Sequence, residues 1–243
     1  MTTIALSLQA LRTSIAHIVA KKSLAKLGNH SPAMSDVTLI AVSKMQTADK
    51  IRAAFLSQQT HFGENYLQEA LSKQTELTDC AITWHFIGPI QSNKTSAIAE
   101  HFDWVHTVDR LKIAERLNST CSTLNKQLNI CIQINVSAED SKSGVSLNDL
   151  PMLAQQIQKL THLKLRGLMA IPAPTNDMTL QHAQFKQIRL AAESLNQSGF
   201  ALDTLSMGMS DDYEAAILEG ATMIRLGTAI FGARPQNTHT LNE

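Results

Sequence analysis

The sequence predicts an α/β protein in which eight parallel strands and the helices between them close into a single (β/α)8 barrel, with an extra N-terminal helix. Its 243 residues are close to the ~250 that are typical of such barrels. Short apolar segments alternate along the chain with segments rich in helix-forming residues, which is the pattern of a parallel sheet. No Gly/Ser linker or change in composition marks a second domain. We therefore expect residues 1–243 to form one domain.

The N-terminal segment has the spacing of an amphipathic helix. Its apolar residues recur every three or four positions, which places them on one helix face: Ile4, Leu8, Leu11, Ile15 and Ile18. Gly28 offers a stop. We expect this helix within residues 1–28, packed on the outside of the barrel.

Eight short apolar segments are the expected strands, and seven helices fit between them. The strands are Val37–Ser43, Thr60–Gly63, Ile82–Ile87, Trp104–Val108, Leu128–Val136, Leu163–Ile171, Leu202–Met207 and Thr222–Leu226. Only eleven residues follow Gly232, among them Pro235, so residues 233–243 should be a polar tail rather than an eighth helix. The N-terminal helix can fill that gap in the outer ring.

Charge and cysteine content restrict the partners and the compartment. The 21 Lys and Arg residues balance 21 Asp and Glu residues, which argues against a nucleic-acid partner or an acidic membrane surface. Three cysteines without a C-x-x-C pair, Cys80, Cys121 and Cys131, suit a reducing cytoplasm. Apolar runs such as Leu39–Val42 are far shorter than a membrane span. We expect a cytoplasmic protein with no membrane or nucleic-acid partner.

Lys44 is the first candidate functional residue. It ends a nearly continuous apolar strand, and in such barrels the carboxyl ends of the strands build the site. Burial there should lower the pKa of its amine, and a neutral amine is what imine formation with an aldehyde needs. The alternative is a strand-end lysine paired with a carboxylate such as Glu64.

The loops after the seventh and eighth strands form the second candidate, because barrels often bind phosphate there. Gly208 and Gly227 allow close approach of the main chain, and the hydroxyl groups of Ser206, Ser210 and Thr228 can donate hydrogen bonds. Either segment alone could be an ordinary loop. Together, opposite a strand-end lysine, they suggest pyridoxal 5′-phosphate (PLP), which has both an aldehyde and a phosphate.

Several strings in fixed order carry a resemblance to a known family. They are Ala41–Lys44, Phe62–Glu69, Trp84–Gly88, Gln91–Lys94, Ser141–Gly144 and Ser206–Gly232. In these strings the chain resembles the pyridoxal phosphate homeostasis proteins, cytosolic PLP-binding proteins similar to the barrel domain of alanine racemase. Family members commonly have Thr-Lys-Pro where this chain has Met45, Gln46 and Thr47.

The resemblance implies a role for each matching residue. Lys44 would hold PLP as a Schiff base, and Asn65 would line the cofactor nearby. Ser206, Met207, Ser210, Gly227 and Thr228 would surround the phosphate. Arg225 would face the pyridine nitrogen.

The resemblance also implies a carrier that buffers or delivers PLP, and not an enzyme. Racemases need an acid–base group on each face of the cofactor. Alanine racemase takes the second from a C-terminal domain that has no counterpart here, and Tyr66 and Tyr213 both lie at predicted helix starts. A PLP-dependent amino-acid racemase of low activity, with water or His85 as second base, is one alternative. A lysine aldolase-type barrel acting on a phosphosugar is another.

Three further expectations concern partners and single residues. Apo-enzymes that require PLP would receive the cofactor, and the protein should be a monomer, because the racemase domain that forms a dimer is missing. Lys142 is either a transient acceptor of the aldehyde or a solvated loop lysine. His85 either faces the site or packs in the core, and no metal site is expected, since His101 and His106 lack ligand spacing.

Overall fold

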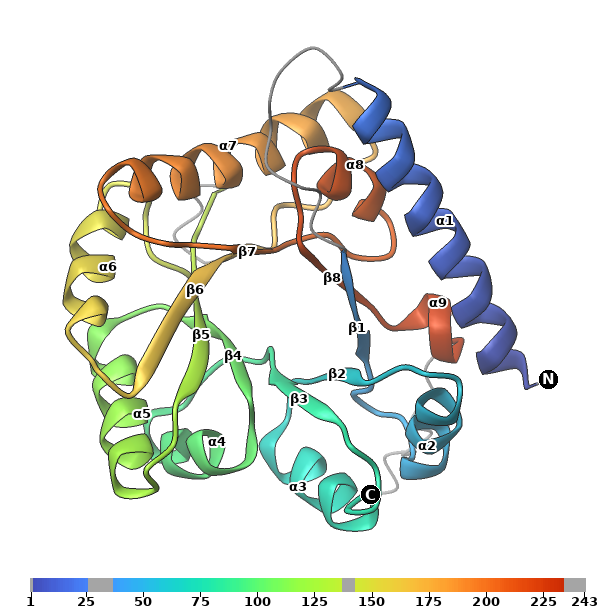
Figure 1. The fold of residues 1–243 in the computed structure, drawn as a ribbon, viewed down its shortest axis with the longest axis horizontal. Helices are drawn as coiled ribbons and strands as arrows, with labels where there is room; N and C mark the ends of the chain where they lie inside the picture. Colours follow the sequence, from blue (N-terminus) through green and yellow to red (C-terminus); the bar gives the residue numbers. More distant parts are fainter. Residues whose placement is uncertain (1, 26–36, 137–142, 234–243) are drawn as a thin grey trace, which may run out of the picture.

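The computed structural model describes residues 2–25, 37–136 and 143–233. Eight strands in chain order pair in parallel, and the last pairs with the first, so the sheet is a closed barrel. In Figure 1 the strands occupy the centre and the helices surround them. The predicted fold class is confirmed.

The strands lie where the apolar segments predict them: six are shorter by one to three residues, one has the predicted bounds, and one is shifted by one residue toward Glu64. They are β1 (Thr38–Val42), β2 (His61–Glu64), β3 (Thr83–Phe86), β4 (Trp104–Val108), β5 (Leu128–Gln133), β6 (Leu163–Met169), β7 (Thr204–Ser206) and β8 (Met223–Leu226). The largest difference is after β5, where the strand was expected to reach Val136. Instead the strand ends at Gln133, although the Ile134 N–H still donates to Met169 O of β6, and the main chain of Gln133 and Asn135 bonds to Val145 of the following loop.

Helices surround these strands, and all but the first and the last lie between two consecutive strands. They are α1 (Thr3–Ala25), α2 (Ala48–Leu56), α3 (Leu67–Glu76), the 3₁₀ turn η1 (Ser92–Lys94), α4 (Thr95–His101), α5 (Leu111–Thr123), α6 (Leu150–Gln158), α7 (Met178–Gln197), α8 (Tyr213–Leu218) and α9 (Thr228–Phe231). Pro151 lies in the first turn of α6 after the N-cap Asp149, where a missing main-chain N–H costs the helix no hydrogen bond.

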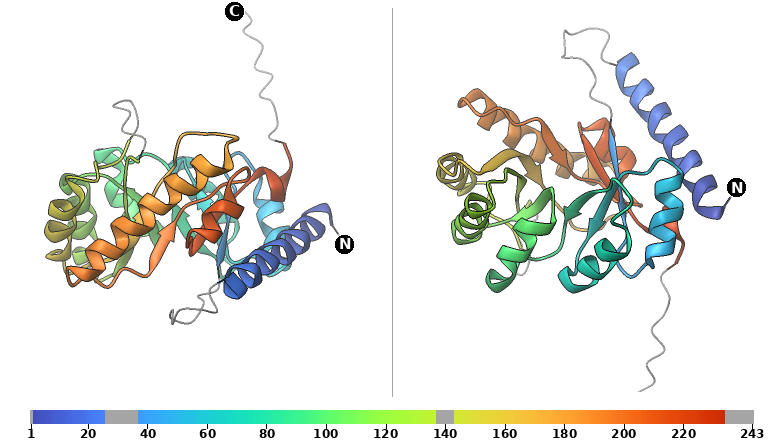
Figure 2. Two further views of the ribbon diagram at one scale, coloured as in Figure 1. Left: turned by 90° about the horizontal axis from the view of Figure 1, so that it is seen from above. Right: turned by 60° about the horizontal axis from the view of Figure 1, so that its bottom comes forward.

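Helix α1 takes the place of the missing eighth helix. Up to residue 233, the last that the structure describes, the single turn α9 is the only helix after β8, and α1 packs against α2, α8 and α9 to complete the ring. Figures 1 and 2 show α1 along the outer edge of the barrel beside α8. By length and composition, residues 3–23 would suffice to cross a membrane, yet Leu8, Leu11, Ile15 and Ile18 are buried against the barrel. Residues 26–28 and the tail residues 234–243 lie outside the described part of the chain.

Two apolar clusters stabilise the molecule. The larger one fills the layer between the sheet and the helices. The smaller one lies inside the barrel and consists of Ile40, Trp104, Cys131, Met169 and Met223. The barrel is therefore packed at its centre, and the site is restricted to its carboxyl end.

Candidate functional site

Lys44 follows β1 at the carboxyl mouth of the barrel, where its main chain is held on both sides. The main-chain oxygen of Ser43 accepts a hydrogen bond from Lys73 Nζ at 2.7 Å. The main-chain N–H of Met45 donates to Glu69 Oε1 at 2.5 Å. Both partners belong to α3, so this helix fixes the residues before and after Lys44.

A buried ion pair lies beneath Lys44. Lys73 Nζ contacts Glu64 Oε1 at 2.7 Å and Glu69 Oε1 at 2.6 Å, and Ser43 Oγ donates to the same Glu64 oxygen at 2.6 Å. Burial raises the pKa of Glu64, and Lys73 opposes that rise. The alternative in which Glu64 pairs with Lys44 stays untested, since the described partners of Glu64 Oε1 are Lys73 and Ser43.

The residue after Lys44 has a left-handed main chain. Met45 has φ 62°, a conformation that residues with a Cβ adopt at a cost. The bond from its N–H to Glu69 offsets part of that cost. Strain of this kind concentrates at functional sites. Here it lies in the segment Met45, Gln46 and Thr47, where this sequence differs from the Thr-Lys-Pro that family members commonly have.

Asn65 directly follows Glu64, the last residue of β2. Its side-chain oxygen Oδ1 is buried and has no hydrogen-bond partner in the described structure. Buried polar atoms are normally paired, so an unpaired one needs an explanation. Its main chain packs closely against Gly88, where a Cβ would lie 2.1 Å from Asn65 O. Gly88 therefore fixes the position of Asn65.

The loop after β7 turns sharply before α8. Gly208 has φ 96°, and a Cβ there would lie 2.6 Å from the Cβ of Ala216, so only glycine fits. The Met209 N–H donates to Asp212 Oδ1 at 2.6 Å, and Asp212 directly precedes the first residue of α8. This geometry leaves Ser210 partly exposed at the mouth.

The main chain after β8 supplies the other half of the predicted phosphate loop. Gly227 precedes α9, and Thr228, the first residue of that turn, is exposed. A Cβ at Gly227 would lie 3.1 Å from Val42 O, near the end of β1. The strand pairing of β1 with β8 thus places Gly227 and Thr228 beside the segment that carries Lys44.

Arg225 is a buried cation inside the barrel. It is 4% exposed, Nη1 donates to Ser206 Oγ at 2.7 Å, and Nη2 donates to Ala170 O at 3.0 Å. No carboxylate of the described residues forms an ion pair with it. Burial lowers its pKa to about 10, so it remains charged at neutral pH.

The predicted site residues divide into two layers. Lys44, Asn65, Ser210, Gly227 and Thr228 are partly or fully exposed at the mouth. Ser206 and Met207 are completely buried below them, so a direct contact of these two with phosphate stays a prediction. Lys142 lies outside the described residues.

Sequence reasoning missed two groups. Lys73 and Glu69 support Lys44, and the signal was their spacing of four on a helix that begins within the Phe62–Glu69 string. His61 and His106 join His85 inside the barrel; the signal was a histidine on each of three consecutive strands. Across the residues that the structure describes, no group of three His, Cys, Asp or Glu side chains is arranged to hold a metal.

Comparisons with known proteins identify the family. The model of the alanine racemase N-terminal domain matches residues 21–235. A pyridoxal phosphate homeostasis protein of Pseudomonas aeruginosa is 54% identical over 228 residues, which cover 93% of this chain and 97% of that protein. The chain belongs to the pyridoxal phosphate homeostasis protein family. A family member from Escherichia coli is 50% identical over 202 residues, covering 82% of this chain and 86% of its own length.

Solved structures agree with this membership of the pyridoxal phosphate homeostasis proteins. PipY of Synechococcus elongatus, solved with PLP bound, has a TM-score of 0.77 and 40% identity, and the match covers 88% of this chain and all of that one. An unknown protein from Bifidobacterium adolescentis has a TM-score of 0.84 and 30% identity over 94% of each chain. An alanine racemase of Clostridium difficile, at 14% identity and TM-score 0.67, covers 92% of this chain and 61% of that one, and shows the shared fold alone.

Proposed function

We propose that this protein binds PLP at the carboxyl mouth of the barrel and holds or delivers it as part of PLP homeostasis in the cytoplasm. The observation that carries the proposal is the pairing of β1 with β8, in which Ile40 lies opposite Arg225. This pairing brings the segment of Lys44 next to a buried cation and to the Gly227–Thr228 turn. The relatives named for PLP homeostasis, and PipY with PLP bound, support it.

The residues present fit PLP by their chemistry. Asn65 Oδ1 is buried without a hydrogen-bond partner among the described residues and can accept a hydrogen bond from a ligand group. The described contacts of Arg225 use one hydrogen on each terminal nitrogen, so its remaining N–H groups can donate to a ring nitrogen. Ser210 and Thr228 offer two accessible hydroxyl groups for a phosphate.

Each residue then has a role. When bound, PLP supplies an aldehyde with which a lysine amine condenses to a Schiff base, releasing water. Lys44 provides that amine, and the bonds of Lys73 and Glu69 to its neighbours hold its main chain in place. Ser210, Gly227 and Thr228 bind the phosphate, while Ser206 and Met207 support this layer from below.

A carrier role agrees better with these side chains than turnover does. PLP enzymes that stabilise a carbanion strongly keep the ring nitrogen protonated with a carboxylate, and Arg225 can only donate there. A racemase also needs a second base. Both ring nitrogens of His85 bond to other histidines, and burial lowers its pKa well below the usual value. The Tyr213 hydroxyl pairs with Ser14 of α1.

Absorption spectra of the wild type, Lys44→Ala and Lys112→Ala test the proposal. After incubation with PLP, the visible band of a lysine-bound cofactor should be present in wild type and in the exposed control Lys112→Ala, and absent in Lys44→Ala. Borohydride reduction followed by peptide mass spectrometry should place the added mass on Lys44. A band that survives in Lys44→Ala, with the mass on another lysine, would refute the assignment.

The racemase alternative is tested with the same proteins. L-alanine and D-alanine are each added to the PLP-loaded wild type, and isomer exchange is followed by chiral chromatography. We expect no sustained exchange. Exchange that wild type performs and Lys44→Ala does not would make the protein an enzyme with a second base.

Delivery and oligomeric state complete the proposal. We propose a monomer that transfers PLP to apo-enzymes, with the free cysteines Cys80, Cys121 and Cys131 suited to a reducing compartment. Light scattering after size-exclusion chromatography measures the mass. Recovery of activity by a PLP-dependent apo-enzyme, separated from the loaded protein by a dialysis membrane or mixed directly with it, shows whether contact accelerates transfer.

A further inference from the structure

A chain of hydrogen-bonded side chains crosses the inside of the barrel from Arg225 to His61. Arg225 Nη1 lies 2.7 Å from Ser206 Oγ, which lies 2.8 Å from His106 Nδ1. His106 Nε2 lies 2.9 Å from His85 Nδ1, and His85 Nε2 lies 3.0 Å from His61 Nδ1. Ser206, His85 and His106 are completely buried. The chain connects the carboxyl mouth with the opposite end of the barrel.

Arg225 determines which atom donates and which accepts in each hydrogen bond of this chain. A guanidinium only donates, so Ser206 Oγ accepts from it. The hydroxyl of Ser206 keeps one hydrogen, and among the described residues its other partner is His106 Nδ1. Leaving a buried hydroxyl hydrogen without an acceptor is unfavourable. Ser206 therefore donates to His106 Nδ1, which must carry no hydrogen.

The same order of donor and acceptor holds for the three histidine rings. His106 with a bare Nδ1 carries its hydrogen on Nε2, and that hydrogen is donated to His85 Nδ1. His85 is then also an Nε2–H tautomer and donates to His61 Nδ1. All three rings are held neutral, because burial lowers the pKa of each, that of His106 to about 3.

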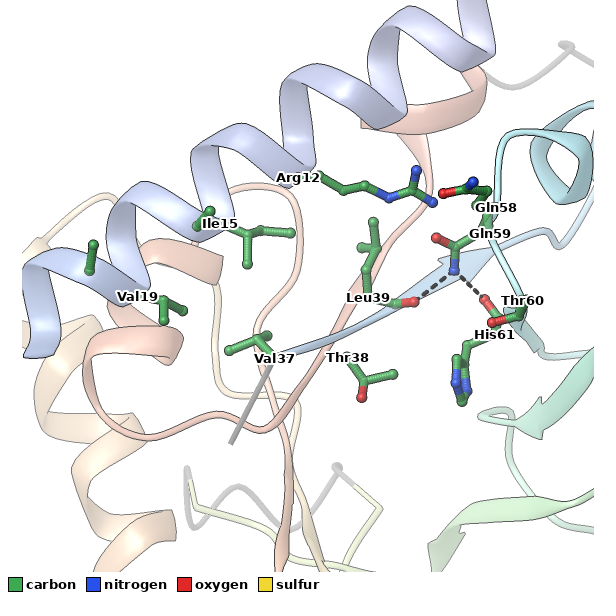
Figure 3. A pocket seen from close by; sticks show the side chains of 12 residues that line it. Arg12, Ile15, Val19, Val37, Thr38, Leu39, Gln58, Gln59, Thr60 and His61 are labelled. Carbon is green, nitrogen blue, oxygen red and sulfur yellow. Dashed lines mark hydrogen bonds between the residues drawn. The ribbon is translucent and has the colours of Figure 1, made fainter. Parts of the chain in front are cut away.

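His61 ends the chain at a cavity. It is half-buried at the start of β2 and lines a space of about 600 Å³ between α1 and the starts of β1 and β2. Figure 3 shows its ring below Thr60, with the Gln59 amide bonded to the main-chain oxygens of Leu39 and His61. The main chain of His61 is thus fixed, and its Nε2–H marks the far end of the chain.

We infer that His106, His85 and His61 are positioning residues for Arg225, which act through Ser206 by forming one uncharged donor chain. The inference rests on the proposed function, in which Arg225 donates to the ring nitrogen of PLP. Ser206 and the three neutral rings hold the guanidinium of Arg225 in place. A carboxylate in their position would compete with the cofactor for the hydrogens of the guanidinium. The ring of His85 also stacks on Trp104 with ring centroids 5.7 Å apart, and the ring of His106 lies tilted against the same indole at 5.8 Å.

The tautomers of the PLP-free protein are the first test. Long-range ¹H–¹⁵N correlation spectra of the full ¹⁵N-labelled chain at neutral pH distinguish Nε2–H from Nδ1–H, and single His→Asn variants assign the signals. We expect Nε2–H tautomers for all three rings. An Nδ1–H tautomer or fast exchange between the two at His106 or His85 would overturn the inference, whether or not the protein binds PLP.

Replacement of His106 is the second test. His106→Phe fills a similar volume but leaves Ser206 without an acceptor, whereas His106→Asn places an oxygen near the position of Nδ1. We expect His106→Phe to bind PLP about tenfold more weakly and to shift the absorption maximum, with recovery of both in His106→Asn. Equal affinity and identical spectra in wild type and His106→Phe would refute a positioning role.

The two tests separate this inference from the proposed function. If wild type shows no Lys44-dependent band, the proposed function fails, and the tautomers still decide the existence of the chain. If the band forms normally and His106→Phe leaves it unchanged, the proposed function stands and the positioning role is wrong.

Discussion

The ammonium group of Lys73 lies 2.7 Å from Glu64 Oε1, and the two side chains are 7% and 0% exposed. The same nitrogen donates to the main-chain oxygen of Ser43, the residue before Lys44. A buried charge pair therefore lies directly under the lysine that we assign to the cofactor.

Loss of Lys73 should destabilise the fold strongly. Lys73→Met leaves the carboxylate of Glu64 buried without its counterion, and we expect the free energy of unfolding to fall by about 3 to 5 kcal/mol in urea denaturation. Lys73→Met with Glu64→Gln should recover most of the loss, because no charge is then left unpaired. The exposed control Lys112→Met should change stability by less than about 0.5 kcal/mol. No recovery in the double variant would contradict this view of the pair.

The buried histidines should make the protein less stable in acid. Burial, and to a lesser extent the charge of Arg225, lowers the pKa of His106 from 6.5 to about 3 in the folded state. The folded pKa lies below the unfolded one, so its contribution is complete above pH 6.5 and is lost as the pH falls toward 3. Each such histidine changes the free energy of unfolding by up to about 1.4 kcal/mol per pH unit.

Urea denaturation at several pH values between 4 and 7, with wild type, His106→Asn and His101→Asn, checks this slope. We expect a shallower pH dependence in His106→Asn and the wild-type slope in His101→Asn, since His101 is exposed. Identical slopes in all three proteins would show that folding does not lower the pKa of His106.

The left-handed residue after Lys44 should be sensitive to a β-branched side chain. Met45 has φ 62° and Gln58 has φ 65°, so Met45→Val and Gln58→Val introduce the same kind of strain in different places. Each should lower the free energy of unfolding by about 1 to 2 kcal/mol. Met45→Val alone should slow the appearance of the visible PLP band, because it displaces the main chain next to Lys44. If the visible PLP band appeared at the same rate in both variants, the strain at Met45 would have no effect on cofactor binding.

The contact between Gly88 and Asn65 should control cofactor affinity. In Gly88→Ala the new Cβ would lie 2.1 Å from Asn65 O, so Asn65 must move. We expect PLP to bind at least about tenfold more weakly by fluorescence titration, equivalent to one lost hydrogen bond. Gly199→Ala, where the Cβ meets nothing within 4 Å, should lose some stability because of its φ of 95° and keep its affinity. Unchanged affinity for PLP in Gly88→Ala would show that Asn65 does not contribute to cofactor binding.

The barrel was predictable from the sequence because its strands are nearly continuous apolar segments and its helices have a clear period. Strand ends were less predictable. From its apolar residues, Leu128–Val136 is predicted as one strand. The structure ends β5 at Gln133, where the chain begins to pair with Val145 of the following loop. A tertiary contact of this kind has no local signal.

Lys44 and the two loops were predictable because their positions follow from strand ends. The support under Lys44 was not, since the charge of Lys73 looks like an ordinary helix surface charge until α3 is seen to face the barrel mouth. The histidine chain was missed for a related reason. The sequence suggests His106 only as a possible metal ligand with His101, on the segment from the end of α4 to β4, whereas its partners lie on β3 and β7.

The position of α1 has a consequence for synthesis. Its docking surface includes α8 and α9, which leave the ribosome roughly 200 residues later, about 10 to 40 s at usual elongation rates. During that time the apolar face of α1 has no barrel to cover it, and this face belongs to the most apolar long helix of the described chain. Nascent-chain chaperones therefore have their longest access to this protein at its first helix. That helix can leave a chaperone and dock on the barrel only when the last strand has closed the ring.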